Sequence, residues 1–398
     1  MATTTSSVSI SALLKKTEHY DKDERYMATS DLCEVLKRHA SGGNTSYEGY
    51  GKMDASTERR ICTAVLRLLH DKSNDVQAIA VKTLGILLTT VHEEQVLEIA
   101  DSLADQVLDS QKSELRDVYA IGLRTLCKTV PSPMGDRVSQ RLVGRLLDGI
   151  RASASEEIVL ACLDVLSDML ARFGATALSL TRQHEQILQI CLNQLSSDVH
   201  VVRKRAGNTL GTLSAVLTDA LLVRMVESLL SQIDMADGAG KQRKNLIQPS
   251  KKDNCKIGDT RALIRTMCTV SGTVGYRLGQ TQIDRIIPIF LKFCDPNDAI
   301  TGDDDELEED DDMQEDGNEV TAALANDLRE SCFNGFESFV SLCPTEVETH
   351  LEKIIQAAMA YMNYDPNYSY GEEEQPEDQD DDGNSILFCL FKLGNIFD

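Results

Sequence analysis

Apolar residues between positions 198 and 213 recur with the spacing of one face of an α-helix. The sequence there is DVHVVRKRAGNTLGTL, and its apolar stripe consists of Val202, Ala206, Leu210 and Leu213. Gaps of four, four and three residues are typical of an amphipathic helix. Asp198 stands where an N-cap residue would lie, and Arg203, Lys204 and Arg205 place charge between the apolar positions. The segment therefore predicts a helix with one buried face.

Variants of this segment recur along the chain, each with a residue that can be buried at the position of Leu210. The seven anchor residues are Leu32, Leu84, Leu123, Leu166, Leu210, Cys268 and Phe336. Seven residues before each anchor lies a second recurring position, occupied by Arg25, Gln77, Arg116, Val159, Arg203, Arg261 and Arg329. An arginine there can bind an acidic group or the carboxyl end of a neighbouring helix. We favour this structural role over a role in binding a partner.

The spacing of the anchors predicts the fold class. Successive anchors are 52, 39, 43, 44, 58 and 68 residues apart, and HEAT and armadillo repeats have a period of roughly 40–47 residues. We therefore predict an all-α, right-handed HEAT/armadillo-type helical-repeat solenoid of about seven to eight two-helix repeats over residues 1–370. The long spacings predict insertions, which we place at 41–53, 235–256 and 297–319.

Negative charge is concentrated in two stretches of the chain. The formal net charge is -24, yet residues 298–319 carry 13 Asp or Glu and residues 371–382 carry 8, without any Lys or Arg. Without these 21 acidic residues the formal charge is -3. Runs of like charge repel themselves, so we expect 371–384 and the acidic insertion to be disordered. The helical body is nearly neutral, which argues against binding to nucleic acid.

Eleven cysteines are scattered singly through the expected helices, and none forms a C-x-x-C pair. Such cysteines behave as small buried hydrophobic residues, which favours a reducing, intracellular compartment over a disulfide-linked scaffold. The N-terminal sequence lacks the pattern of a signal peptide. No apolar run reaches the roughly 18 residues of a membrane span.

Sequence motifs for catalysis are missing. The segment GYGKM around Lys52 lacks the glycine spacing and the Ser or Thr of a P-loop. No pair of histidines has the spacing of a zinc site on a helix, and no G-x-S-x-G elbow is present. We therefore expect a protein that is not an enzyme and that has no catalytic, cofactor-binding or metal-binding residues.

Five segments together resemble one family, the cullin-associated and neddylation-dissociated proteins. These are DKDERYMATSDL (21–32), VGYRLG (274–279), IIPIFLKFC (286–294), LRESCFNGFESFVSLCPTEV (328–347) and YMNYDPNYSY (361–370). The last segment, followed at once by an acidic tract, is the most specific of the five. The resemblance covers nearly all of residues 1–382 and corresponds to roughly the first third of a family member.

The resemblance implies a non-catalytic regulator of cullin–RING ubiquitin ligases. Family members bind a cullin that lacks its ubiquitin-like modifier, together with the RING-box protein, and promote substrate-receptor exchange and SCF complex assembly. This chain would supply the N-terminal binding portion only. The resemblance also implies a monomer when free, present in the cytoplasm and the nucleus, without a cofactor, a small-molecule substrate, a nucleic acid or a membrane as partner.

Candidate partner-binding residues lie in the segment that carries the most specific resemblance. They are Tyr364, Asp365, Pro366, Asn367, Tyr368 and Tyr370. Tyrosine is favoured at interfaces because it combines a large apolar area with a hydrogen-bonding hydroxyl. An equally good interpretation is a packed turn between repeats.

Two other classes of helical-repeat protein remain as alternatives. An importin-type nuclear transport receptor is also acidic, but it would present an acidic inner face, whereas this helical body is nearly neutral. A phosphatase-type HEAT scaffold would lack the acidic insertions. The final segment SILFCLFKLGNIFD (385–398) departs from the family pattern, and we expect such an ending from a truncated gene product, a retained intron or a split-gene fragment.

Overall fold

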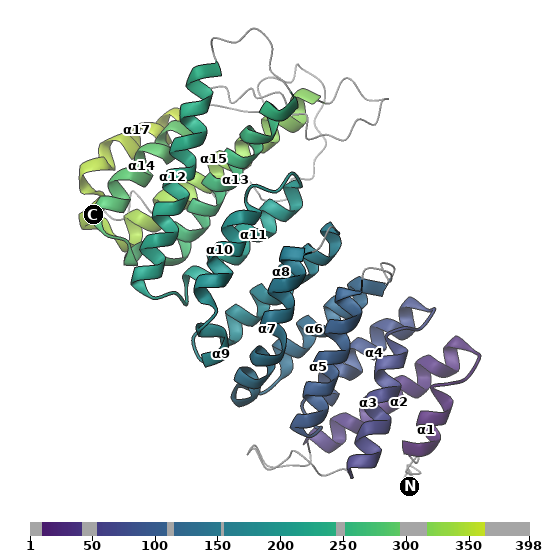
Figure 1. Ribbon diagram of the computed structural model, residues 1–398. Coiled ribbons are helices and arrows are strands. Elements are labelled where there is room, and N and C mark those ends of the chain that lie inside the picture. Colours follow the sequence, from purple (N-terminus) through teal and green to yellow (C-terminus); the bar gives the residue numbers. More distant parts are fainter. Residues whose placement is uncertain are drawn as a thin grey trace, which may run out of the picture. The chain divides into compact units, whose positions relative to one another are not determined.

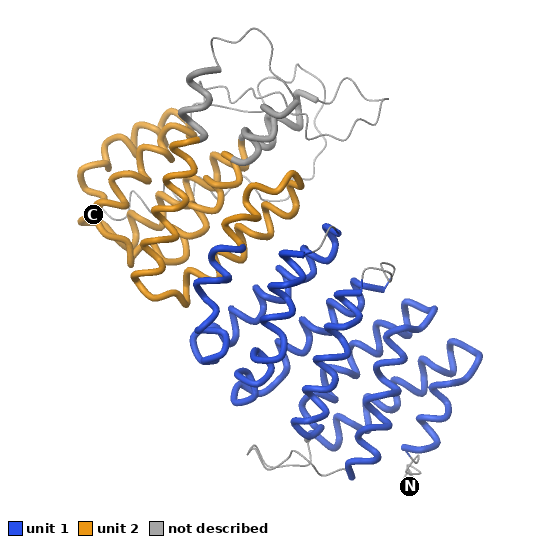
Figure 2. The backbone as a smooth tube through the Cα atoms, viewed as in Figure 1, with its two compact units in different colours: residues 1–190 blue, residues 191–398 orange. Residues whose placement is uncertain are grey.

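The computed structural model describes residues 10–41, 54–109, 115–152, 155–243, 251–294 and 317–362 (Figure 1). Within these ranges all regular secondary structure is helical. The chain divides into two compact units, residues 1–190 and residues 191–398 (Figure 2). The six candidate residues between Tyr364 and Tyr370, the acidic tract 371–384 and the tail 385–398 lie outside the described ranges.

The first unit is built from helix pairs that form two layers. Its helices are α1 (Ile10–Lys16), α2 (Lys22–Ser41), α3 (Ala55–Leu68), α4 (Asn74–Leu87), α5 (Glu93–Leu108), α6 (Arg116–Thr129), η3 (Ser132–Met134), α7 (Gly135–Ala152), α8 (Glu156–Phe173) and α9 (Leu178–Thr181). Helices α1, α3, α5 and α7 pack in succession as one layer, and α2, α4, α6 and α8 as the other. We call these layers the first helices and the second helices of the repeats. Helix α10 (His184–Gln194) crosses the boundary between the units.

The second unit repeats this arrangement. It contains α11 (His200–Ser214), α12 (Asp219–Arg243), α13 (Lys251–Val274), η4 (Gly275–Arg277), α14 (Gln280–Cys294), α15 (Gly317–Leu342), α16 (Pro344–Val347), η5 (Glu348–His350) and α17 (Leu351–Met362). The second helices α11, α13 and α15 pack in succession, and the first helices α12, α14 and α17 form the other layer. Stacked helix pairs of this kind confirm the predicted HEAT/armadillo-type solenoid.

All seven anchor residues are buried, with exposed fractions between 0% and 6%. Each lies on a second helix, in order α2, α4, α6, α8, α11, α13 and α15. The anchor position therefore identifies the second helix of each of these repeats. Burying each such side chain contributes about 1.5–3 kcal/mol to folding.

The position seven residues before the anchor ties together the two helices of a repeat. Arg203 Nη1 donates to the carbonyl oxygens of Ser197 (2.8 Å) and Asp198 (3.1 Å), in the loop that precedes its own helix. Gln77 Nε2 donates in the same way to the Asp71 carbonyl oxygen at 2.7 Å. These donors satisfy carbonyl groups that helix geometry and tight loops leave unbonded.

Arg25 and Arg116 also donate to carbonyl oxygens that precede their own helices. Each adds an ion pair with the next repeat, Arg25 with Asp71 and Arg116 with Glu157. Arg25 donates to the His19 carbonyl oxygen (2.9 Å) and binds the Asp71 carboxylate through Nε (2.6 Å) and Nη2 (2.8 Å). The Arg25 guanidinium thereby lowers the pKa of the Asp71 carboxyl. Arg116, only 2% exposed, donates to the carbonyl oxygens of Val107 and Asp109. These contacts support the structural interpretation of the arginine position.

One predicted helix cap is wrong, and two helices extend beyond their apolar stripes. The N-cap of α11 is Val199, without a side-chain cap hydrogen bond, and not Asp198. Helix α12 continues to Arg243 and α13 begins at Lys251, so both helices enter the predicted insertion at 235–256. The apolar stripe is lost there, but Ala, Lys, Gln and Arg are good helix formers, and helix propensity does not depend on an apolar face.

The predicted insertion at 41–53 lies outside the described ranges except for Ser41, which ends α2. The insertion at 297–319 lies outside them up to residue 316, and α15 begins at Gly317. Nine cysteines in the described ranges are free thiols, and all nine are buried. Burial raises the pKa of Cys127 and of Cys191 to about 12, so these thiols stay protonated and pack as apolar groups. None of the helices described is both long and apolar enough to cross a membrane.

Replacing Leu84 with Asp tests the assignment of the buried layer. Leu84 is 0% exposed, so Leu84→Asp places an unpaired carboxylate between second helices. We expect a loss of at least about 3 kcal/mol in the free energy of unfolding, measured by urea denaturation. Ala78→Asp adds the same charge at an exposed position of α4 and should cost less than about 1 kcal/mol. Equal losses in the two variants would contradict the assignment.

Removing the Arg116 guanidinium tests the contact between the two helices of a repeat. Arg116→Met leaves the carbonyl oxygens of Val107 and Asp109 without their donor, at a cost of about 2–4 kcal/mol. The control is Arg141→Met, which removes an ion pair with Asp101 from a side chain that is 55% exposed and should cost at most about 1 kcal/mol. Thermal melts of both variants provide the comparison, and an unchanged Tm for Arg116→Met would refute the structural role.

Candidate functional site

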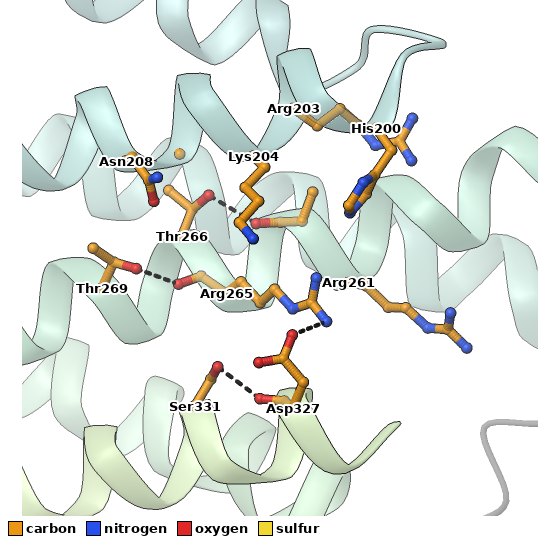
Figure 3. Close-up of a pocket in the computed structure, with 12 residues that line it drawn as sticks. His200, Arg203, Lys204, Asn208, Arg261, Arg265, Thr266, Thr269, Asp327 and Ser331 are labelled. Carbon is orange, nitrogen blue, oxygen red and sulfur yellow. Dashed lines mark hydrogen bonds and ion pairs between the residues drawn. The ribbon is translucent and has the colours of Figure 1, made fainter. Parts of the chain in front are cut away.

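A hollow of about 180 Å³ lies across the second helices α11, α13 and α15 in the second unit (Figure 3). We call it the α11–α13–α15 groove. The residues that line it are His200, Arg203, Lys204, Gly207, Asn208, Arg261, Ala262, Arg265, Thr266, Thr269, Asp327 and Ser331. Each helix contributes from one face, at positions that the periodic pattern leaves outside the apolar stripe.

Small residues on α11 allow α13 to approach closely beneath the groove. A Cβ atom on Gly207 would lie 2.5 Å from Oγ1 of Thr266, and one on Gly211 would lie 2.5 Å from Cγ2 of Thr269. Such contacts are too short for any residue but glycine without movement of the neighbouring side chain. The close approach brings the longer side chains of the two helices onto one shared surface.

Positive charge dominates the groove. His200, Arg203 and Lys204 come from α11, and Arg261 and Arg265 come from α13, against one carboxylate, Asp327 of α15. Arg265 Nη2 lies 2.6 Å from Asp327 Oδ2, and this pair links neighbouring second helices. The Asp327 side chain is 60% exposed, whereas that of Arg265 is 20% exposed.

The cations of the groove divide into structural and accessible ones. Arg203 donates to loop carbonyl oxygens, and Arg261 is 6% exposed. Lys204 is exposed, and Figure 3 shows its side chain reaching from α11 towards Arg265. Lys204 forms no salt bridge with any residue in the described part of the chain. Lys204 and Arg265 are therefore the two cations of the groove that are accessible to a ligand.

Hydroxyl groups in the groove already use their protons. Thr266 Oγ1 donates to the Ala262 carbonyl oxygen (2.7 Å), and Ser331 Oγ donates to that of Asp327 (2.8 Å). A hydroxyl whose proton is committed to the backbone can only accept further hydrogen bonds. Recognition of an anion would therefore rest on Lys204, Arg265 and the exposed amide of Asn208.

A second hollow, of about 520 Å³, lies between the second helices α2 and α4 of the first unit. Its charges are mixed, since Lys22 and Lys82 face Asp23 and Asp75, and Tyr26 adds an aromatic ring. Within the described residues, no group of three or more His, Cys, Asp or Glu side chains could hold a metal ion.

The residues that line the two hollows were not among the sequence-predicted candidates. The candidates between Tyr364 and Tyr370 lie outside the described ranges, so they stay a prediction. Sequence analysis noted the charge of Lys204 but missed the groove, because Arg265 and Asp327 come from repeats up to 123 residues away. A signal was available, since polar residues beside three successive anchors must share one surface once the second helices stack.

Solved structures of importins share the fold. The chain superposes on a mutant of Kap121p with a TM-score of 0.62 and 12% identity, covering 98% of this chain and 34% of that chain. The corresponding values for yeast importin-β (Kap95p) are 0.55 and 12%, covering 98% and 42%. Identity this low establishes the fold alone.

Sequence relatives are more specific. No family model matches the chain. The cullin-associated NEDD8-dissociated protein 2 of Mus musculus is 33% identical over 370 residues, 92% of this chain and 25% of its own length. The cullin-associated NEDD8-dissociated protein 1 of Dictyostelium discoideum is 29% identical over 364 residues, 90% of this chain and 25% of its own length.

A shorter relative points to the same region. The protein of Emericella nidulans named as the N-terminal part of cullin-associated NEDD8-dissociated protein 1 is 25% identical over 268 residues, and 75% of that protein is covered. The chain spans about a quarter of the length of its longer relatives, less than the third that the resemblance implied. Over about nine tenths of its length, the chain belongs to the family of cullin-associated NEDD8-dissociated proteins.

Proposed function

We propose that this chain is a non-catalytic protein that binds a cullin together with its RING-box subunit when the cullin lacks its ubiquitin-like modifier. The observation that carries the proposal is the 33% identity, over 92% of the chain, to a protein named for its association with cullins. The names of the relatives also refer to dissociation from NEDD8, which motivates the dependence on the modifier. The chain acts as a monomer in the cytoplasm and the nucleus in this proposal.

The second helices are the surface that we assign to the cullin complex. Both hollows lie across second helices, one in each unit. Ion pairs between repeats occur on both layers, as in Arg141 with Asp101 on first helices and Arg124 with Asp168 on second helices of the first unit. Arg285 and Glu227 form such a pair in the second unit. The two hollows are therefore the observation that favours the second helices.

Substrate-receptor exchange and SCF complex assembly are assigned to the longer proteins of the family. Those relatives are about four times as long as the region that they share with this chain. Exchange requires a protein to hold the cullin and to displace a receptor module at the same time. We propose that this chain supplies the first of these two actions and supports the second only together with the remaining family sequence.

Titration of the chain against a cullin–RING-box complex tests this function. We expect binding to the unmodified complex and binding at least about tenfold weaker to the complex that carries the modifier, a difference of about 1.4 kcal/mol. Isothermal calorimetry with both complexes gives the two Kd values. Equal affinity for the two complexes would contradict the dependence on the modifier, and absence of binding to both would contradict the function.

Paired variants test the assigned surface. Tyr26→Ala with Lys82→Glu alters the α2–α4 hollow and should weaken binding at least about tenfold, because aromatic side chains at an interface often contribute about 2 kcal/mol. Arg137→Glu with Arg141→Ala alters the exposed face of the first helix α7 and should change Kd less than about twofold. The reverse ranking would place the cullin complex on the first helices.

A further inference from the structure

The charged side chains of the α11–α13–α15 groove are mainly basic, whereas the chain as a whole is negatively charged. The chain has a net charge of -24, yet four Lys or Arg side chains and one carboxylate line this hollow. Basic side chains gathered at one place create a positive potential that attracts anionic groups. The lining of this groove is therefore suited to an anionic partner.

Two of these cations are placed to receive a carboxylate. Lys204 is exposed and has no salt bridge within the described residues. Arg265 already holds one carboxylate at 2.6 Å, so its guanidinium is shown to bind this group in this position. Asp327 lies on a neighbouring helix with a side chain that is 60% exposed. Such an exposed ion pair is worth at most about 1 kcal/mol, so an incoming carboxylate can displace Asp327 or bind beside it.

The size of the groove favours part of a larger partner over a free small molecule. Its volume of about 180 Å³ is below the roughly 300–1,000 Å³ of typical small-molecule sites. It extends over three stacked helices, which suits an extended segment that places successive side chains along it.

We propose that the α11–α13–α15 groove binds an extended, Asp- and Glu-rich segment of a partner protein, with Lys204 and Arg265 as the carboxylate-binding residues. Asn208 donates its amide protons to the same segment. Asp327 acts as an internal competitor that occupies Arg265 until the segment arrives. The groove lies on the helix layer that we assign to the cullin complex, but this proposal rests on the chemistry of the groove alone and can be tested without a cullin.

A labelled acidic peptide tests the proposal without any cullin present. The probe is fluorescein-labelled GEDEEDEG, the control probe is its amide counterpart GQNQQNQG, and the protein is the full chain at about 50 mM salt. We expect saturable anisotropy changes with the acidic probe only, and weaker binding at higher salt because charge pairing is screened. Equal binding of the two probes would overturn the proposal.

Three single variants separate the groove from general electrostatic attraction. Lys204→Glu should weaken binding of the acidic probe about tenfold, whereas Lys353→Glu, the same charge reversal at an exposed position of α17, should change it less than about twofold. Asp327→Asn should strengthen binding about threefold, because it removes the competitor of Arg265. All three positions are exposed, and circular dichroism checks that each variant is folded.

Two results would overturn the assignment. One is an equal effect of Lys204→Glu and Lys353→Glu, which would mean that the probe senses only net charge. The other is weaker binding by Asp327→Asn. A single-stranded oligonucleotide that binds more tightly than the acidic probe, and loses its binding with Lys204→Glu, would make the groove a phosphate site instead. Failure of this assay leaves the calorimetric test of cullin binding unaffected, so the two proposals stand or fall separately.

Discussion

Burial of one apolar side chain per second helix is the interaction on which the rest of the structure depends. A single pair of helices cannot bury its apolar face, so each repeat needs its neighbours. Leu84 and Leu123 are both fully buried on successive second helices, and the same holds for Leu210 in the second unit. The polar sides of these helices are thereby aligned on one surface in each unit. The partner-binding surface that we propose would therefore follow from the packing of the repeats.

Apolar contacts are not directional, so they do not determine which residues of neighbouring helices lie opposite one another. Ion pairs between successive repeats do. Ion pairs in the first unit join residues one repeat apart, such as Arg141 and Asp101, 40 residues apart, or Arg124 and Asp168, 44 residues apart. In the second unit the equivalent separation is 58 residues for Arg285 and Glu227. The contact is the same while the sequence between its partners is longer. The added residues, which lengthen α12, α13 and the chain between them, therefore leave this contact between first helices in place.

Much of the fold could be predicted from the sequence, because a single spacing specifies it. The anchors and the arginine position identified every second helix that the structure describes from α2 to α15. The ends of α12 and α13 could not be predicted from apolar periodicity, because polar residues with high helix propensity extend a helix without a stripe. The groove could not be predicted either, since Lys204, Arg265 and Asp327 belong to three repeats and meet only through stacking. Their positions beside the anchors were visible, but their neighbours in space were not.

The central claim is that the second helices form the partner-binding surface, and side-chain footprinting with hydroxyl radicals tests it most directly. Met27 on α2, a second helix of the first unit, and Met359 on α17, a first helix of the second unit, are 58% and 54% exposed, so the two side chains start with nearly equal reactivity. With an unmodified cullin–RING-box complex bound, the account predicts that oxidation of Met27 and Tyr26 slows while oxidation of Met359 is unchanged. Protection of Met359 together with unchanged oxidation of Met27 would contradict it.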